Sequence, residues 1–152
     1  MNTQEQLALA IRIAVTAHEG QYDKGGKPYI LHPLHLMSQL MYDPELAAIA
    51  VLHDVVEDSK WTMNDLVDNG FSDRVVNTVY KLTHQHGETY DEYIGYICDS
   101  IDAIIVKRKD LEHNSDITRL KGVTDKDLAR MAKYHKAFIK LGKARDELRG
   151  LK

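Results

Sequence analysis

The chain has 152 residues, 43% hydrophobic and 28% charged, which suits one globular domain over residues 1–152 and leaves little room for a second. A formal charge of −3 gives no electrostatic footprint for nucleic acid, and no apolar run reaches the roughly 20 residues that span a bilayer. The N-terminus lacks a signal-peptide layout, and the lone cysteine, Cys98, indicates a reducing cytoplasm rather than a disulfide scaffold.

Apolar residues recur at helical spacing along nearly the whole chain, and no strand alternation persists long enough to need a sheet. Thr3 with Gln6 resembles a capping box at the first helix, and Thr124 with Asp127 begins the last one. We therefore predict an all-α domain of about eight helices with non-bundle packing. The predicted helices span residues 3–18, 33–40, 44–58, 62–68, 72–82, 90–99, 102–113 and 124–148. The core-facing stripe expected in the last helix is Leu128, Met131, Ala132, Phe138, Ile139 and Leu141.

The most informative stretch closes the third predicted helix, where the apolar run 46–52 is followed by His53, Asp54, Glu57 and Asp58. Burying a lone charge costs several kcal/mol unless it is paired or bound to a metal, and acids are disfavoured at a helix C-terminus. Residues four apart share one helical face, so His53 should lie beside Glu57 and Asp54 beside Asp58. A solvated helix end is the alternative, but the apolar turns before it favour a divalent metal and hence a hydrolase.

Two further segments offer ligands of the same kind. His32 precedes a predicted helix, and on spacing alone it is as well explained by packing as by ligation. Asp110 and Asn114 lie four apart on one helical face at the end of the predicted 102–113 helix, which alone would be a mixed-charge helix exit. Taken with His53 and Asp54, His32 and Asp110 complete two imidazoles and two carboxylates without a thiolate. Such a set fits Mn²⁺, Fe²⁺ or Mg²⁺ better than a structural zinc.

Three sequence blocks match one family in order and spacing. They are AHEGQYDKGGKPYILHPL at 17–34, AVLHDVVEDS at 50–59 and VKRKDLEHN at 106–114. The adjacent His53-Asp54, with His32 upstream and Asp110 downstream, resembles the HD superfamily of metal-dependent phosphohydrolases. The three blocks together are similar to the hydrolase domain of the RelA/SpoT group, whose small stand-alone members hydrolyse alarmones. The resemblance covers roughly residues 3–120.

The resemblance implies a role for each matching residue. The implied Mn²⁺ ligands are His32, His53, Asp54 and Asp110. Glu57 and Asp58 match the acidic pair that orients or activates the attacking water and handles protons, while Lys24 and Asn114 match residues that contact the nucleotide. The implied reaction removes pyrophosphate from the 3′ position of guanosine 3′,5′-bis(diphosphate) and yields GDP or GTP. The implied partner is a small-molecule nucleotide, and the sequence does not set the oligomeric state.

The sequence departs from the family pattern around the nucleotide rather than around the metal. Asp23 stands where several alarmone hydrolases have an arginine that stacks on the base, and Lys109 replaces the usual alanine before Asp110. Two alternatives therefore stay open: another HD-type nucleotide phosphatase or phosphodiesterase, and a non-catalytic nucleotide-binding module. For Arg119, surface charge is favoured over a contact with a 5′-diphosphate, and for His18 a structural hydrogen bond is favoured over ligation.

Overall fold

The computed structural model describes residues 1–151, and within them every regular element is helical. The prediction of an all-α fold is confirmed. None of the helices in this described range is long and apolar enough to cross a membrane. The elements are α1 (Thr3–Ala17), α2 (Leu31–Ser38), α3 (Pro44–Leu52), α4 (Val55–Asp58), α5 (Met63–Asp68), α6 (Asp73–Leu82), α7 (Tyr90–Ile97), α8 (Ile101–Asn114), the 3-10 turn η1 (Ile117–Arg119) and α9 (Asp125–Leu148).

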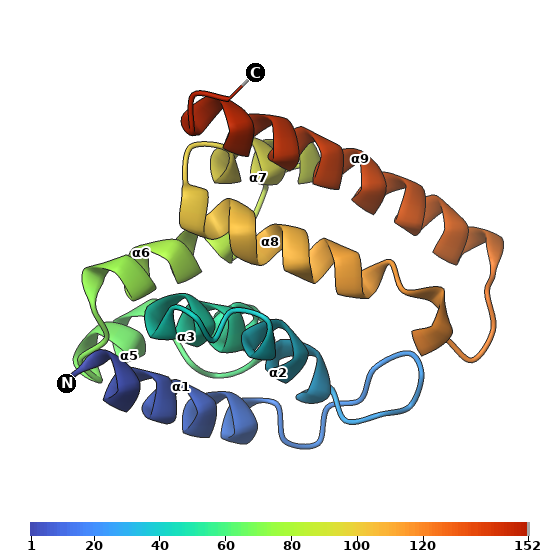
Figure 1. Ribbon diagram of the computed structural model, residues 1–152. Helices are drawn as coiled ribbons and strands as arrows, with labels where there is room; N and C mark the ends of the chain where they lie inside the picture. The colour runs from blue at the N-terminus through green and yellow to red at the C-terminus, as the bar shows by residue number, and fades with distance from the viewer. Residues whose placement is uncertain (152) are drawn as a thin grey trace.

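The helices form stacked layers rather than a parallel bundle (Figure 1). Helix α8 lies between the long α9 and the pair α2 and α3, and α1 covers the outer side of that pair. Helix α3 is the centre of the core because it packs against α1, α2, α6 and α8. All seven residues from Leu46 to Leu52 are buried, as expected for a helix that is apolar on every side. Asp43 caps this helix, and Pro44 fills its first turn.

The predicted helix over 44–58 is divided in the structure, which is a correction to the sequence-based expectation. Helix α3 ends at Leu52, Asp54 has φ −108° and ψ 0°, and α4 begins at Val55. His53 and Glu57 therefore do not share one continuous helical face, and neither do Asp54 and Asp58. The division also explains why eight predicted helices correspond to nine α-helices within residues 1–151. A continuous helix would carry the acids along the buried axis of α3, whereas the turn leaves Glu57 and Asp58 open to solvent.

Two other expectations need correction. Helix α1 is capped by Asn2, which forms a capping box with Glu5, so Thr3 and Gln6 are not the capping pair. In α9 the predicted stripe is only partly right: Leu141 is buried and Phe138 packs against the core, whereas Leu128 and Ile139 are exposed. Two small residues, Ala137 and Gly142, are also buried on this helix, which packs against α8. A Cβ at Gly142 would lie 3.2 Å from the Arg108 guanidinium, which stacks 3.9 Å from the Phe138 ring centroid.

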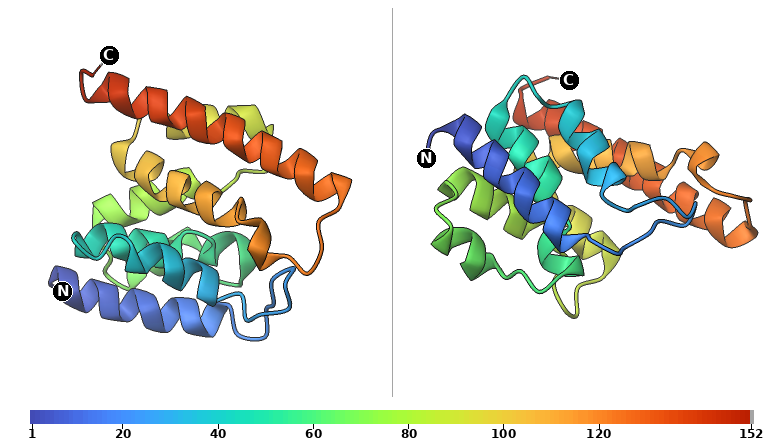
Figure 2. Two further views of the ribbon diagram at one scale, coloured as in Figure 1. Left: turned by 45° about the vertical axis from the view of Figure 1, so that its right-hand side comes forward. Right: turned by 90° about the horizontal axis from the view of Figure 1, so that it is seen from below.

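Two connections that are distant in the sequence meet on one side of the molecule. The loop between α1 and α2 reaches the segment that joins α8 to α9, and both views agree on this (Figures 1 and 2). The approach is close at Gly25, where a Cβ would lie only 2.2 Å from the Arg119 backbone oxygen. A glycine is therefore required there for steric reasons. This contact shapes one wall of the pocket described below.

Candidate metal centre

The structure brings together the four residues predicted as metal ligands. One atom from each of His32, His53, Asp54 and Asp110 lies within 4.8 Å of all the others. Asp110 Oδ1 lies 2.8 Å from His32 Nε2 and 3.3 Å from His53 Nε2, and Asp54 Oδ2 lies 2.9 Å from His53 Nε2. The ligand atoms come from α2, from the turn after α3 and from α8. Packing of α2 and α8 against α3 thus creates a cluster that no single segment contains.

The hydrogen bonds of His53 indicate that the cluster is built around positive charge. Its Nδ1 lies 2.7 Å from the Ala50 carbonyl oxygen, which can only accept, so Nδ1 carries a proton. In a neutral imidazole, Nε2 then presents a lone pair, and here that lone pair faces carboxylate oxygens of Asp54 and Asp110. Three electron-rich atoms this close repel one another unless a proton or a cation lies among them. The donor set of this chain therefore fits a divalent metal.

The pKa values of His53, Asp54 and Asp110 are shifted by the attraction between these opposite charges. Burial works against a charged imidazole at His53, yet Asp54 and Asp110 outweigh it and raise the pKa of His53 well above its ordinary value. Burial alone would raise the pKa of Asp54, but His53 outweighs burial and lowers that pKa to about 2. For Asp110 the opposing effect of burial is overcome by Lys107 and the two imidazoles, so its pKa lies well below the usual range. Both carboxylates are thus held ionised, as a metal ligand must be.

Three contacts around the ligands were not anticipated from the sequence. Lys107 Nζ donates to Asp110 Oδ2 at 2.8 Å, one helical turn before it on α8. The Tyr29 hydroxyl donates to Asp54 Oδ2, and burial beside that carboxylate raises the pKa of the phenol. His113 Nδ1 lies 2.7 Å from His32 Nδ1. The signal for Lys107 and His113 was their i−3 and i+3 spacing from Asp110, which places all three on one helical face.

The acidic pair lies on α4, directly after the cluster. Glu57 Oε1 accepts the backbone N–H of His84, and the backbone oxygen of Asp58 accepts a 2.7 Å hydrogen bond from Gln21 Nε2. Both side chains keep exposed surface, but partial removal from water raises their pKa values. At Glu57 the hydrogen bond from His84 opposes this effect, and at Asp58 the charge of Asp54 adds to it. A raised pKa makes a carboxylate a stronger base, which suits it to accept a proton from a reacting group.

The α1–α2 loop is tied to the same region through Gln21. His18 Nδ1 lies 2.8 Å from Gln21 Oε1, which confirms the structural hydrogen bond expected for this histidine. Because Gln21 Nε2 donates to backbone oxygens, its Oε1 must face His18, and His18 Nδ1 is the donor. The end of α1 thus anchors the backbone at Asp58.

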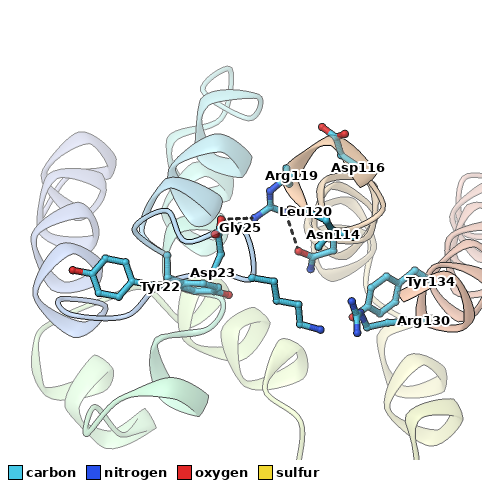
Figure 3. Close-up of a pocket in the computed structure, with 11 residues that line it drawn as sticks. Tyr22, Asp23, Gly25, Asn114, Asp116, Arg119, Leu120, Arg130 and Tyr134 are labelled. Carbon is cyan, nitrogen blue, oxygen red and sulfur yellow. Dashed lines mark hydrogen bonds and ion pairs between the residues drawn. The ribbon is translucent and has the colours of Figure 1, made fainter. Parts of the chain in front are cut away.

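A pocket of about 300 Å³ adjoins the cluster and contains both residues predicted to contact a nucleotide, Lys24 and Asn114. Asn114 Nδ2 donates to Asp110 Oδ1 at 3.1 Å, so it connects the pocket to the ligand set. Figure 3 shows Asp23 and Gly25 on one side and Arg130 and Tyr134 of α9 on the other. The remaining lining residues are Tyr22, Tyr29, Asp116, Arg119 and Leu120.

Arg119 is half-buried in this pocket and paired, rather than a free surface charge. Its Nη1 donates to Asn114 Oδ1 at 3.2 Å, and its Nη2 lies 3.7 Å from Asp23 Oδ2 (Figure 3). Arg130 and Tyr134 were missed because they lie beyond the three sequence blocks, on a helix whose charges resemble a solvated face. Nothing in the spacing of α9 indicates that its first half covers a pocket.

Comparisons with known proteins agree with this arrangement. The sequence model of the HD domain matches residues 10–90, more than half of the chain. A guanosine-3′,5′-bis(diphosphate) 3′-pyrophosphohydrolase of Haemophilus influenzae is 34% identical over 115 residues, 67% of this chain and 17% of that protein. The bifunctional (p)ppGpp synthase/hydrolase SpoT of Escherichia coli K12 is 32% identical over 124 residues, 72% of this chain and 18% of that protein.

One solved structure has the same fold. It is described as a metazoan ortholog of SpoT that hydrolyzes ppGpp, and it aligns with a TM-score of 0.74 at 22% identity over 97% of both chains. The two curated relatives are much longer, and this chain spans 17% and 18% of them. The helical architecture, the adjacent His53-Asp54 and the matched residues 10–90 lead to one assignment. This chain belongs to the HD domain family.

Proposed function

We propose that the protein is a Mn²⁺-dependent pyrophosphohydrolase that removes the 3′-diphosphate of guanosine 3′,5′-bis(diphosphate). The products are GDP, or GTP from the corresponding triphosphate, and pyrophosphate. The observation that carries the proposal is the convergence of two imidazoles and two carboxylates beside a pocket with basic side chains. The names of the relatives over the matched region support the same reaction.

In this proposal His32, His53, Asp54 and Asp110 hold the metal. A bound divalent cation lowers the pKa of water and withdraws charge from a phosphoryl group. Mixed nitrogen and oxygen ligands favour Mn²⁺, with Fe²⁺ and Mg²⁺ as alternatives. The ionised carboxylates supply the negative charge that such a cation requires, and the Nε2 lone pair of His53 supplies a neutral nitrogen donor.

Glu57 and Asp58 are proposed to exchange protons with the reacting groups. Each has a raised pKa and stands on α4, three or four residues beyond Asp54. The backbone N–H of His84 fixes the Glu57 carboxylate, and Gln21 fixes the backbone of Asp58. Glu57 is thereby held in place to accept a proton from attacking water, and Asp58 to assist it.

The pocket is proposed to bind the nucleotide. Lys24 and Arg130 bring positive charge for phosphates, and Asn114 connects the bound nucleotide to the ligand set through Asp110. Tyr22 and Tyr134 offer ring faces on which a base can stack. Asp23 pairs with Arg119 and occupies the position where several alarmone hydrolases have a base-stacking arginine. This difference favours the second candidate function, an HD-type phosphohydrolase acting on a different nucleotide.

The partner of the protein in this proposal is a diffusible nucleotide, and nucleic acid is not a substrate because the chain has a net charge of −3. The proposed compartment is the reducing cytoplasm, which suits a chain with the single cysteine Cys98.

The deciding assay incubates the protein with Mn²⁺ and guanosine tetraphosphate and follows GDP and pyrophosphate. We expect Asp54→Asn to abolish both Mn²⁺ binding and turnover. Glu57→Gln should keep Mn²⁺ binding within a few-fold but lose turnover by roughly 100-fold or more, as expected for loss of a general base. Glu112→Gln, an exposed acid on α8, is the matched control and should behave as wild type.

Other outcomes of this assay identify the alternatives. Turnover of another nucleotide in a substrate panel, without release of pyrophosphate from a 3′ position, would establish the second candidate function. Tight Mn²⁺ binding without turnover of any nucleotide would indicate a binding module. Wild-type rates in Glu57→Gln would remove this residue from the mechanism.

A further inference from the structure

Helix α8 contacts both ring nitrogens of His32. Asp110 Oδ1 lies 2.8 Å from Nε2, and His113 Nδ1 lies 2.7 Å from Nδ1. Asp110 and His113 are three residues apart, so they project from the same face of the helix. His32 itself is buried, with 2% of its surface exposed, so water does not compete for either nitrogen. One helix therefore determines the environment of both ends of this imidazole.

The short distance between the two Nδ1 atoms requires a single proton between them, and metal binding by His32 decides which nitrogen carries it. Two ring nitrogens 2.7 Å apart form a hydrogen bond only if one carries a proton and the other a lone pair. A histidine that binds a metal through Nε2 must carry its proton on Nδ1. In the proposed metal centre, His32 Nδ1 is therefore the donor and His113 Nδ1 the acceptor, with the proton of His113 on its Nε2.

His53 also donates a hydrogen bond from Nδ1, but to a different kind of acceptor. Its Nδ1 donates to the Ala50 carbonyl oxygen at 2.7 Å, inside its own helix. His32 lies in the first turn of α2, and its Nδ1 has its hydrogen-bond partner on another element. That partner is the His113 imidazole of α8. A neutral acceptor adds no third negative charge to the two carboxylates.

We propose that His113 is a positioning residue that holds His32 in the tautomer and ring orientation of a metal ligand. This inference rests on the proposed function only in assuming that His32 binds a metal. Outer partners of metal-bound histidines are usually carboxylates, backbone carbonyls or water, and losing them weakens metal binding about 10–100-fold. The His113 ring is kept in place by stacking on His35, with centroids 4.0 Å apart and planes 19° apart.

Three variants separate hydrogen bonding from packing. His113→Phe keeps a ring for stacking but removes the acceptor. His113→Asn restores an acceptor, because its Oδ1 is attached to Cγ as Nδ1 is in histidine. His35→Phe is the matched control, since His35 also stacks on His113 but makes its ring hydrogen bond to Gln39. Mn²⁺ dissociation constants are measured by calorimetry or electron paramagnetic resonance on the whole chain.

We expect His113→Phe to weaken Mn²⁺ binding by about 10-fold or more, with His113→Asn recovering most of the loss and His35→Phe unchanged. Equal affinity of His113→Phe and wild type overturns the inference, and so does equal weakening by His35→Phe. Because the probe is Mn²⁺ alone, failure of guanosine tetraphosphate hydrolysis leaves the inference standing. Failure of the wild-type chain to bind Mn²⁺ overturns both.

A second measurement needs no variant and decides the matter if His113→Phe does not fold. Nitrogen-15 spectra of the histidines in the Zn²⁺-loaded wild-type protein report which ring nitrogen carries each proton. We expect a proton on Nδ1 of His32 and on Nε2 of His113. A proton on Nδ1 of His113 overturns the assignment.

Discussion

At the scale of the residue, each candidate metal ligand contacts a further residue that orients it or compensates its charge. Asp110 uses Oδ1 toward the two imidazoles and Oδ2 toward Lys107. Both partners of this ion pair are largely buried, with 12% of the lysine side chain and 6% of the aspartate side chain exposed. Removing one partner of a buried pair leaves the other charge without compensation. Lys107 therefore stabilises the folded chain through Asp110.

Lys107→Met should destabilise the metal-free protein by roughly 3 kcal/mol, because the buried Asp110 carboxylate loses the lysine charge that compensates it most strongly. Mn²⁺ should return part of this loss, since a cation bound at Oδ1 compensates the same charge. Urea unfolding with and without Mn²⁺ measures both effects. Lys109→Met is the control: Lys109 lies 3.9 Å from the largely exposed Glu112, and its loss should cost less than about 1 kcal/mol. Equal losses in the two variants would contradict this account.

At the scale of the element, the pocket exists because an irregular loop lies against an irregular turn. The α1–α2 loop supplies Lys24, the turn η1 supplies Arg119, and Gly25 allows their backbones to touch. None of the four metal ligands belongs to either segment. The shape of the nucleotide pocket and the affinity for metal should therefore respond to different substitutions.

Gly25→Ala tests this separation. The new Cβ would lie 2.2 Å from the Arg119 backbone oxygen, so the loop must move away from η1 and take Lys24 with it. We expect KM to rise by about tenfold while the Mn²⁺ affinity stays within a few-fold, by steady-state kinetics and calorimetry. Gly95→Ala on the exposed side of α7 meets nothing within 4 Å and should instead stabilise the fold by about 0.5–1 kcal/mol. An unchanged KM in Gly25→Ala would show that the loop does not shape the substrate site.

At the scale of the whole molecule, Arg74 connects three helices. From α6 it donates to Asp43, the N-cap of α3, and to Asp102 in the first turn of α8, each at 2.8 Å. The hydrogen bond from Arg74 is the largest of the effects that hold the pKa of Asp43 below its ordinary value. A carboxyl group whose pKa is lower in the folded state stabilises the fold above its unfolded pKa of about 4. That contribution disappears as the pH falls through the folded pKa.

Arg74→Met should lower the free energy of unfolding at pH 7 by roughly 1 kcal/mol, because the network is partly exposed and screened. The difference between wild type and variant should shrink as the pH falls from about 5 toward 2, since protonated Asp43 no longer benefits from the arginine. Urea unfolding across this range in the presence of a chelator checks the sign. Asp43→Asn should remove the same pH dependence, and a constant difference between wild type and Arg74→Met would contradict the assignment.

Much of the fold could be read from local patterns. The capping box at Thr124 and the buried run 46–52 are encoded by neighbours in the chain, and the structure has them where the sequence predicts. The four candidate ligands were found because buried polar residues after an apolar run need a partner, and because three blocks resembled one family. These inferences depend on spacing within one helix or on the order of motifs, which the sequence contains directly.

The division of the central helix at His53-Asp54, the partners of the ligands and the α9 side of the pocket were decided by tertiary structure. His113 is acceptor for His32 only because α8 crosses α2, and Arg130 reaches the pocket only because α9 folds back over α8. Helical periodicity shows which residues share a face but not which faces meet, because that choice depends on how all helices together exclude water. The sequence alone therefore determined most of the helices and the candidate ligands, and the packing of the helices determined their contacts and the division of the central one.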